Sequence, residues 1–416
     1  MGSRTVRSNQ QKYSRRPLVT PVKVLHVVPA LAACYGGPSK VVLDTCRALR
    51  SEGVQAEIAT TNANGDTNSP LPLESPSFLD TVPVHFFERQ QPWRYAFSWP
   101  MTQWLKQNVA NYDLLHIHAV FSYSTTAAAF YARKFRVPYI IYPHGMLAPW
   151  PLRKSRIRKA LYLKAMEQKT IERANAIQFT AEEEFSMSTA VGKSRFVLPC
   201  IFDLEENHRE RSNGTSRDAK PNILFLSRID PKKGIDTLIS ALKRLASEGR
   251  EFVFTLAGSG DTAYEEKVAG MIRDAGLLGR TVIKGFVTGQ EKASTFKEAD
   301  IFVLPSHQEN FGIVVMEAMA SGLPVIISNE VNIHGDIAKA KAGLVVSPES
   351  DELYNAILKL LETPQLRIEM GQRARRFVEL NHSPSSTARE MSRVYHDIIH
   401  GSRTSDAWRT SEFSSK

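Results

Sequence analysis

Short apolar runs rich in β-branched residues alternate along the chain with segments whose apolar residues recur at helical spacing. The first run, residues 22–28, leads through a small-residue loop into Gly36-Gly37-Pro38, and a helical apolar pattern follows over 41–49. A strand, a glycine turn and a proline in the first helical turn predict a βα unit. Further strands are predicted at 54–59, 82–87, 114–118 and 139–142, and this alternation implies a mostly parallel sheet covered on both faces.

The pattern stops at residues 205–220, a polar stretch with almost no apolar content that predicts an interdomain linker. Beyond it, strands are predicted at residues 222–226, 252–257, 282–286, 301–305, 324–327 and 343–346. Helices are predicted at residues 234–248, 263–275, 352–361, 364–380 and 384–400. We therefore expect an α/β protein made of two doubly wound, Rossmann-like domains.

These domains are predicted to span residues 21–204 and 221–382, one on each side of the linker. Residues 1–20 are expected to be a disordered basic N-terminus, 383–400 a C-terminal helix and 401–416 a disordered tail. The length of 416 residues suits two domains of roughly 150–200 residues each.

Composition points to a globular protein, with 42% apolar and 23% charged residues. The sequence has no apolar run of about 20 residues, and its polar, basic start lacks the apolar core of a signal peptide. Three widely spaced cysteines, Cys34, Cys46 and Cys200, indicate neither a disulfide framework nor a metal cluster. A cytoplasmic setting is the expectation.

The net charge of +10 could favour nucleic acid, a membrane surface or an anionic small molecule. No recognisable nucleic-acid motif accompanies the basic residues, so we expect no nucleic-acid partner. Residues 150–173 alternate cations with apolar side chains and could lie on an anionic membrane surface, or could form a helix with a solvated basic face.

The sharpest chemical signal is the segment 305–324, which follows the predicted strand 301–305. Glu309 lies in the loop after the strand, a helix should begin near Phe311-Gly312, and Glu317 lies about one and a half turns along it. The first amides of a helix suit a phosphate or sugar oxygen. A buried carboxylate at 317 would accept hydrogen bonds from ribose hydroxyls. A pair of glutamates eight apart is common by chance, so the alternative is a surface loop with two solvated carboxylates.

The full string of motifs resembles the retaining glycosyltransferases of family four. It comprises Glu309-(seven residues)-Glu317 with Asn310-Phe311-Gly312 after the first glutamate, Leu226-Ser-Arg228-Ile-Asp-Pro-Lys-Lys233-Gly234, Leu256-Ala-Gly258-Ser-Gly260 and the Gly36-Gly37 loop. The resemblance covers about residues 22–382. It implies the GT-B architecture, with an N-terminal acceptor domain, a C-terminal donor domain and a central cleft. The final helix would cross back to the first domain.

The resemblance also implies roles for donor-binding residues. Arg228 and Lys233 would clamp the pyrophosphate, and Gly36 and Gly37 would let the backbone approach it from the other domain. Glu309 would position donor-sugar hydroxyls, with Asn310, Phe311 and Gly312 beside it, and Glu317 would bind the ribose. Gly258 would line the nucleotide pocket and Val287 would pass the base.

Two histidines complete the predicted site. His118 ends the strand 114–118 together with His116 on the same face, and its family position approaches the reacting sugar. His144 follows the strand 139–142 and matches a position on the acceptor side. The alternative is a strand-end histidine with a structural partner, which is the more common case. The predicted catalytic residues are thus Glu309, His118, Arg228 and Lys233.

No Asp-x-Asp motif, nucleophile elbow or phosphate-binding loop ending in Gly-Lys-Ser/Thr occurs in the sequence. We therefore expect neither a metal ion nor a cofactor. The expected reaction transfers a sugar from a UDP- or GDP-sugar to a hydroxyl of a sugar or lipid-linked acceptor, as in exopolysaccharide, lipopolysaccharide or glycolipid synthesis. Two alternatives stay open: a sugar-nucleotide epimerase of the same fold, and a non-catalytic protein that binds sugar nucleotides.

Overall fold

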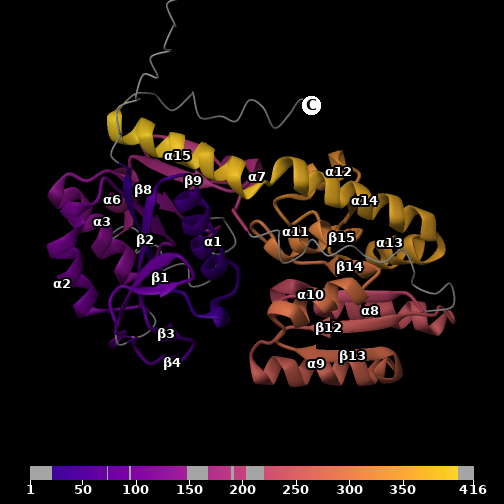
Figure 1. The fold of residues 1–416 in the computed structure, drawn as a ribbon. Helices are drawn as coiled ribbons and strands as arrows, with labels where there is room; N and C mark the ends of the chain where they lie inside the picture. Colours follow the sequence, from indigo (N-terminus) through magenta and orange to yellow (C-terminus); the bar gives the residue numbers. More distant parts are fainter. Residues whose placement is uncertain are drawn as a thin grey trace, which may run out of the picture.

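The structure, a computed structural model, describes residues 21–72, 74–92, 95–147, 167–188, 192–202 and 220–401. These residues form two α/β halves, each built on its own sheet (Figure 1). Outside the described residues lie residues 205–219 of the predicted linker, most of the basic segment 150–173, the N-terminal 20 residues and the tail after residue 401.

The first sheet has eight strands in the order β10-β9-β8-β7-β1-β2-β6-β5. All pair in parallel except β5, which is antiparallel to β6. The bounds are β1 Lys23–Ala30, β2 Gln55–Thr61, β5 Ser77–Leu79, β6 Val82–Phe87, β7 Leu114–His118, β8 Tyr139–Tyr142, β9 Ala176–Phe179 and β10 Arg195–Val197. A small hairpin, β3 Ala63–Asn64 with β4 Thr67–Asn68, lies apart from this sheet.

Helices cover this sheet, and every residue of its central strands β7 and β8 is buried, including two histidines of β7. The covering helices are α1 Gly37–Ser51, α2 Trp99–Asn108, α3 Tyr123–Phe135, α6 Gln168–Glu172 and α7 Glu182–Met187. Helix α1 begins directly after Gly36, whose φ of +75° is a conformation that favours glycine.

The second sheet has six parallel strands in the order β13-β12-β11-β14-β15-β16. Its strands are β11 Asn222–Leu226, β12 Val253–Ala257, β13 Thr281–Gly285, β14 Ile301–Leu304, β15 Val325–Ser328 and β16 Gly343–Val346. Its helices are α8 Ile235–Ser247, α9 Thr262–Asp274, α10 Gly289–Glu298, α11 Ile313–Ala320, α12 His334–Lys339, α13 Ser350–Glu362 and α14 Pro364–Asn381. The strand order reverses between β11 and β14, and at such a point α/β sheets bind ligands beyond the carboxyl ends of their strands.

The last helix, α15 Pro384–His400, lies along the first half although it follows the second half in sequence (Figure 1). Met391, Val394 and Tyr395 are buried in the core that β1, β2 and α1 share, and Arg389 forms a salt bridge of 3.5 Å with Glu52. The apolar stripe of α15 therefore belongs to the first half, and the helix ties the two halves together.

The halves also meet between their sheets. Val41, Tyr142 and Ala181 from the first half belong to the same buried cluster as the core of the second half. Gly37 and Gly145 lie so close to α11 and the loop before it that a Cβ atom on either would stand 2.8 Å from a side chain there. Loops at the carboxyl ends of both sheets are thus in contact.

Candidate active site

The centre of the site is an ion pair between Lys233 and Glu309, from two loops of the second half. Lys233 ends the short 3-10 helix Pro231–Lys233 after β11, which Asp230 caps by accepting from the Lys232 amide at 2.9 Å. Gly234 follows with φ +67° and its backbone against the Pro305 carbonyl, a place with no room for a side chain. This close approach holds the β11 loop beside the β14 loop that carries Glu309.

Charge around Glu309 keeps it ionised. Burial alone would raise its pKa, but Lys233 and then Arg228 more than offset this, and the net pKa is lowered. Arg228 is exposed while Lys233 is buried. The structure therefore brings Arg228, Lys233 and Glu309 together, with one cation paired and the other open to solvent.

Helix α11 begins beside this cluster. Gly312 precedes it with φ +70°, and no side chain caps its first amides. Phe311 is buried in the core of the second half and anchors the turn. A helix N-terminus without a cap offers N–H donors and a positive dipole end to an anion.

Glu317 lies inside the structure rather than on the surface, with 3% of its side chain exposed. It forms an ion pair with Lys292 of α10, with N–O distances of 2.7 and 2.6 Å. Lys292 was not singled out from the sequence because a lysine on a polar helix carries no signal of a buried partner. Binding of the ribose by Glu317, which the resemblance implies, stays a prediction.

The Gly36-Gly37 turn faces this helix from the first half. A Cβ atom on Gly37 would stand 2.8 Å from Cδ1 of Ile313, the first residue of α11, whereas one on Gly36 would meet nothing within 4 Å. The turn therefore approaches α11 closely, with open space at Gly36.

Gly258 and Val287 lie on the side of β12 and β13. The Gly258 amide donates to the Gly285 carbonyl at 2.6 Å, and its backbone packs directly against Ser227, next to Arg228. Val287 is buried just after β13. Both therefore line the edge of the second sheet that carries Arg228.

Asn310 connects the two halves. When the Asn310 amide nitrogen faces Glu184, that nitrogen lies 3.3 Å from both oxygens of the Glu184 carboxylate, and the amide oxygen lies 3.1 Å from the Thr180 hydroxyl. Glu184 also accepts from the amides of Gly145 and Thr180, each at 2.9 Å. Burial raises the pKa of Glu184. The sequence pattern did not single out Glu184, whose position in the short helix α7 gave no signal.

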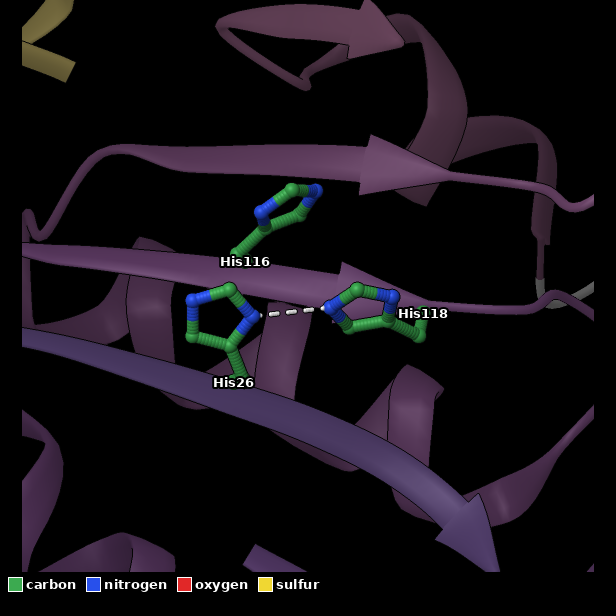
Figure 2. A group of neighbouring side chains, drawn as sticks. All are labelled: His26, His116 and His118. Atoms are coloured by element: carbon green, nitrogen blue, oxygen red, sulfur yellow. Dashed lines mark hydrogen bonds between the residues drawn. The ribbon is translucent and has the colours of Figure 1, made fainter. Parts of the chain in front are cut away.

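His118 lies in a cluster of aromatic rings rather than at a surface. Its Nε2 is 2.9 Å from His26 Nδ1, and its Nδ1 is 3.1 Å from His144 Nε2, so both ring nitrogens have partners within the protein. Figure 2 shows His26 and His118 joined by this hydrogen bond, with His116 beside them. His144 is half-buried, has φ +51° and stacks on Tyr142 with ring centres 3.7 Å apart. His144 is therefore the outer member of the cluster.

Nitrogen atoms of His26, His116 and His118 lie within 4.8 Å of one another, as those of a metal site would. Two imidazole nitrogens on a tetrahedral zinc ion would be about 3.3 Å apart, given bonds of about 2.0–2.1 Å. The His26–His118 separation of 2.9 Å is that of a hydrogen bond instead. The donor set is better explained as a hydrogen-bonded group.

Among the helices of the described residues, none is both long enough and apolar enough to cross a membrane.

Two family models match adjacent parts of the chain. Residues 35–205 match the model described as Glycosyltransferase Family 4, and residues 206–377 match the one described as Glycosyl transferases group 1. Their junction falls inside the predicted linker.

Relatives carry the same kind of name. The 2-deoxystreptamine N-acetyl-D-glucosaminyltransferase of Niallia circulans is 26% identical over 360 residues, covering 80% of this chain and 91% of that protein. The alpha-D-kanosaminyltransferase of Streptomyces kanamyceticus is 29% identical over 198 residues, which are 47% of this chain and 50% of that protein. The chain thus matches about half the length of this second relative.

A solved structure of Anabaena HepE in complex with UDP and glucose matches with a TM-score of 0.72 and 19% identity, over 90% of this chain and 100% of that one. At this identity the likeness concerns the fold. The two Rossmann-like halves, the matching family models and the named relatives agree, and the chain belongs to the group 1 glycosyltransferases of family 4, with the GT-B fold.

Proposed function

We propose that this protein transfers a glycosyl group from a UDP- or GDP-sugar to an acceptor hydroxyl, with retention of the anomeric configuration and without a metal ion. The observation that carries the proposal is the convergence of Lys233, Arg228 and Glu309 beside the uncapped start of α11, opposite the Gly36-Gly37 turn. Two cations and free helix amides suit a diphosphate, and a carboxylate between them suits sugar hydroxyls.

Donor binding would rearrange the ion pair. The diphosphate competes with Glu309 for Lys233, and Arg228, which is exposed, supplies a second cation. Glu309, released in part from Lys233, then accepts hydrogen bonds from donor-sugar hydroxyls. Glu317 accepts from the ribose. The UDP and glucose bound in the HepE structure support a donor of this chemical class.

In the transfer step, the bond between the anomeric carbon and the diphosphate oxygen breaks, and the acceptor oxygen bonds to that carbon on the same face. The acceptor's proton passes to the leaving diphosphate. Arg228, Lys233 and the α11 amides stabilise the negative charge that grows there, a role that a divalent ion takes in other transferases. We therefore propose that the reaction needs no metal.

The acceptor is proposed to be a sugar or a lipid-linked sugar, as in exopolysaccharide, lipopolysaccharide or glycolipid synthesis. The prediction that residues 150–173 lie on an anionic membrane stays a prediction, since residues 148–166 fall outside the described part of the chain.

The test is a panel of UDP- and GDP-sugars, assayed by mass spectrometry for transfer to sugar acceptors and for hydrolysis, with EDTA present. We expect turnover with one donor in EDTA, and NMR of the product should show the donor's anomeric configuration. Conversion of the donor to its epimer without an acceptor would indicate the epimerase alternative. Nucleotide binding without any turnover would indicate the non-catalytic one.

A further inference from the structure

A chain of hydrogen bonds runs from the C-terminal helix α15 to the His144 loop. The Tyr395 hydroxyl lies 2.8 Å from His116 Nδ1 and 3.4 Å from His26 Nε2. His26 Nδ1 contacts His118 Nε2 at 2.9 Å, and His118 Nδ1 contacts His144 Nε2 at 3.1 Å. The residues come from β1, β7, the loop after β8 and α15.

The four imidazoles in this chain of hydrogen bonds are neutral. Burial lowers the pKa of His26 and of His144 to about 3 and lowers the pKa of His116 and His118 well below the usual value. A neutral imidazole has one N–H donor and one acceptor nitrogen. The position of the proton on one ring therefore fixes its position on the next ring.

Gln178 on β9 lies next to His116, at the inner end of this chain of hydrogen bonds. Its Nε2 donates to the Leu198 carbonyl at 3.3 Å, which fixes the orientation of the amide and so the position of its acceptor, Oε1. Oε1 of Gln178 and Nε2 of His116 are both buried without a hydrogen-bond partner, and both residues line a cavity of about 10 Å³. The interaction with the Gln178 side chain raises the pKa of His116 against the larger lowering by burial, as an acceptor beside the ring does, and an acceptor at Nε2 favours the proton on that nitrogen.

The tautomer of His116 determines the tautomer of each following ring in turn. With its proton on Nε2, His116 accepts at Nδ1 from the Tyr395 hydroxyl, whose oxygen then accepts from His26 Nε2. His26 accepts at Nδ1 from His118 Nε2. His118 accepts at Nδ1 from His144 Nε2, and Nδ1 of His144 is left as an acceptor. This arrangement satisfies every hydrogen bond between the rings, and so does the fully reversed one. The Gln178 acceptor beside His116 selects between the two.

We propose that Gln178 and Tyr395 are positioning residues that hold His144 as its Nε2–H tautomer, so that its Nδ1 accepts a hydrogen bond from a substrate hydroxyl. The hydrogen bond from a substrate hydroxyl to Nδ1 rests on the proposed glycosyl transfer, whereas the tautomer of His144 does not. Gly145, the next residue, lies against Asn310 in the loop of Glu309, so His144 stands at the junction of the two halves. Tyr395 of the C-terminal helix α15 thereby helps to fix the tautomer of His144.

The tautomer is measured directly on the free protein. Protein labelled with ¹⁵N-histidine gives long-range ¹H–¹⁵N correlation spectra that identify the protonated nitrogen of each ring, and the His144→Gln variant assigns the His144 signals. We expect Nε2 of His144 to carry the proton. A proton on Nδ1 of His144 overturns the proposal. That tautomer would arise if a water molecule between His116 and Gln178 donated a hydrogen bond to each of them. Failure of glycosyl transfer would leave this spectrum unchanged.

Tyr395→Phe interrupts the chain between His116 and His26. We expect a mixture of His144 tautomers and a kcat lowered about 2- to 10-fold, the value of one hydrogen bond, with the donor KM unchanged. Tyr139→Phe is the matched control. Tyr139 is also a buried tyrosine, but its hydroxyl donates to the Thr170 carbonyl at 2.7 Å and takes no part in the hydrogen bonds of the four histidines. A wild-type tautomer pattern in Tyr395→Phe contradicts the proposal. If that variant does not fold, Gln178→Leu is measured in its place with the same expectation.

Discussion

Lys233 and Glu309 are 76 residues apart in the chain and form one ion pair where the loops after β11 and β14 meet. Neither partner is free to leave without a substitute, because a buried unpaired charge is costly. In the proposed reaction, a diphospho-sugar would supply that substitute on both sides: phosphate oxygens for Lys233 and hydroxyls for Glu309. We therefore expect the donor to engage this ion pair.

Glu309→Gln should lower kcat by on the order of a hundredfold, since the neutral amide cannot balance Lys233 or bind the donor sugar as a carboxylate does. The measurement is kcat with the active donor, with circular dichroism to check folding. Glu251→Gln serves as the control, because Glu251 is an exposed partner of Lys220 and Arg280 on the surface. Equal rates for Glu309→Gln and the control would refute the role of Glu309.

Glu317→Ala should weaken nucleotide binding by about tenfold or more, the value of a charge-assisted hydrogen bond. It also leaves Lys292 without its carboxylate partner, so some loss of stability is expected. Isothermal titration with UDP and GDP measures the affinity. The double variant Glu317→Ala, Lys292→Met separates the two effects, because it removes the unpaired lysine while the ribose ligand stays absent. Normal affinity in both variants would contradict the ribose assignment.

Gly145→Ala tests the contact between the halves. Gly145 has φ +76° and its added Cβ would stand 2.8 Å from the Asn310 side chain. Gly249→Ala is a matched control with φ +75° and nothing within 4 Å of its Cβ. Both variants should lose roughly 1–2 kcal/mol of unfolding free energy from backbone strain. Only Gly145→Ala should also lower kcat/KM, and a similar kcat/KM for the two variants would argue against a functional contact.

Stability should fall as the pH drops below 6.5. The pKa of His26 and His144 is about 3 in the folded protein, and about 4 for His382, against about 6.5 in an unfolded chain. The unfolded state therefore binds protons between pH 6.5 and 4 that the folded state does not, at about 1.4 kcal/mol per pH unit for each histidine.

Urea unfolding at pH 7.5 and pH 5.5 measures this difference, and the expected free energy of unfolding is lower at pH 5.5. His26→Gln should reduce the difference. The same stability at both pH values would mean that these histidines are not held neutral by burial.

The two-domain α/β pattern could be predicted from the sequence because buried parallel strands leave long apolar runs. Strands such as β7 and β11 have the predicted bounds, and β14 ends one residue earlier than expected. The strands β9 and β10 were not predicted, because Gln178 interrupts the apolar run of β9 and β10 has only three residues, the first of them Arg195. Strands β8 and β14, of four residues each, were predicted because their residues are all aliphatic or aromatic.

The motif residues of the second half were identifiable because loop positions after strands carry them. Their partners were not. His26 lies in the middle of an apolar strand and pairs in register with His116, so the signal was two polar residues at buried positions of adjacent strands. Tyr395 reaches His116 across 279 residues, a contact that helical periodicity cannot reveal. Glu184 and Lys292 likewise depend on tertiary contacts.

The most direct measurement is a crystal structure of the protein with the nucleoside diphosphate, UDP or GDP, of its active donor. We expect the diphosphate within hydrogen-bonding distance of Lys233 Nζ and the Arg228 guanidinium, at the start of α11, with the ribose hydroxyls on Glu317. A nucleotide bound elsewhere, with the Lys233–Glu309 pair undisturbed and Arg228 still in solvent, would contradict it.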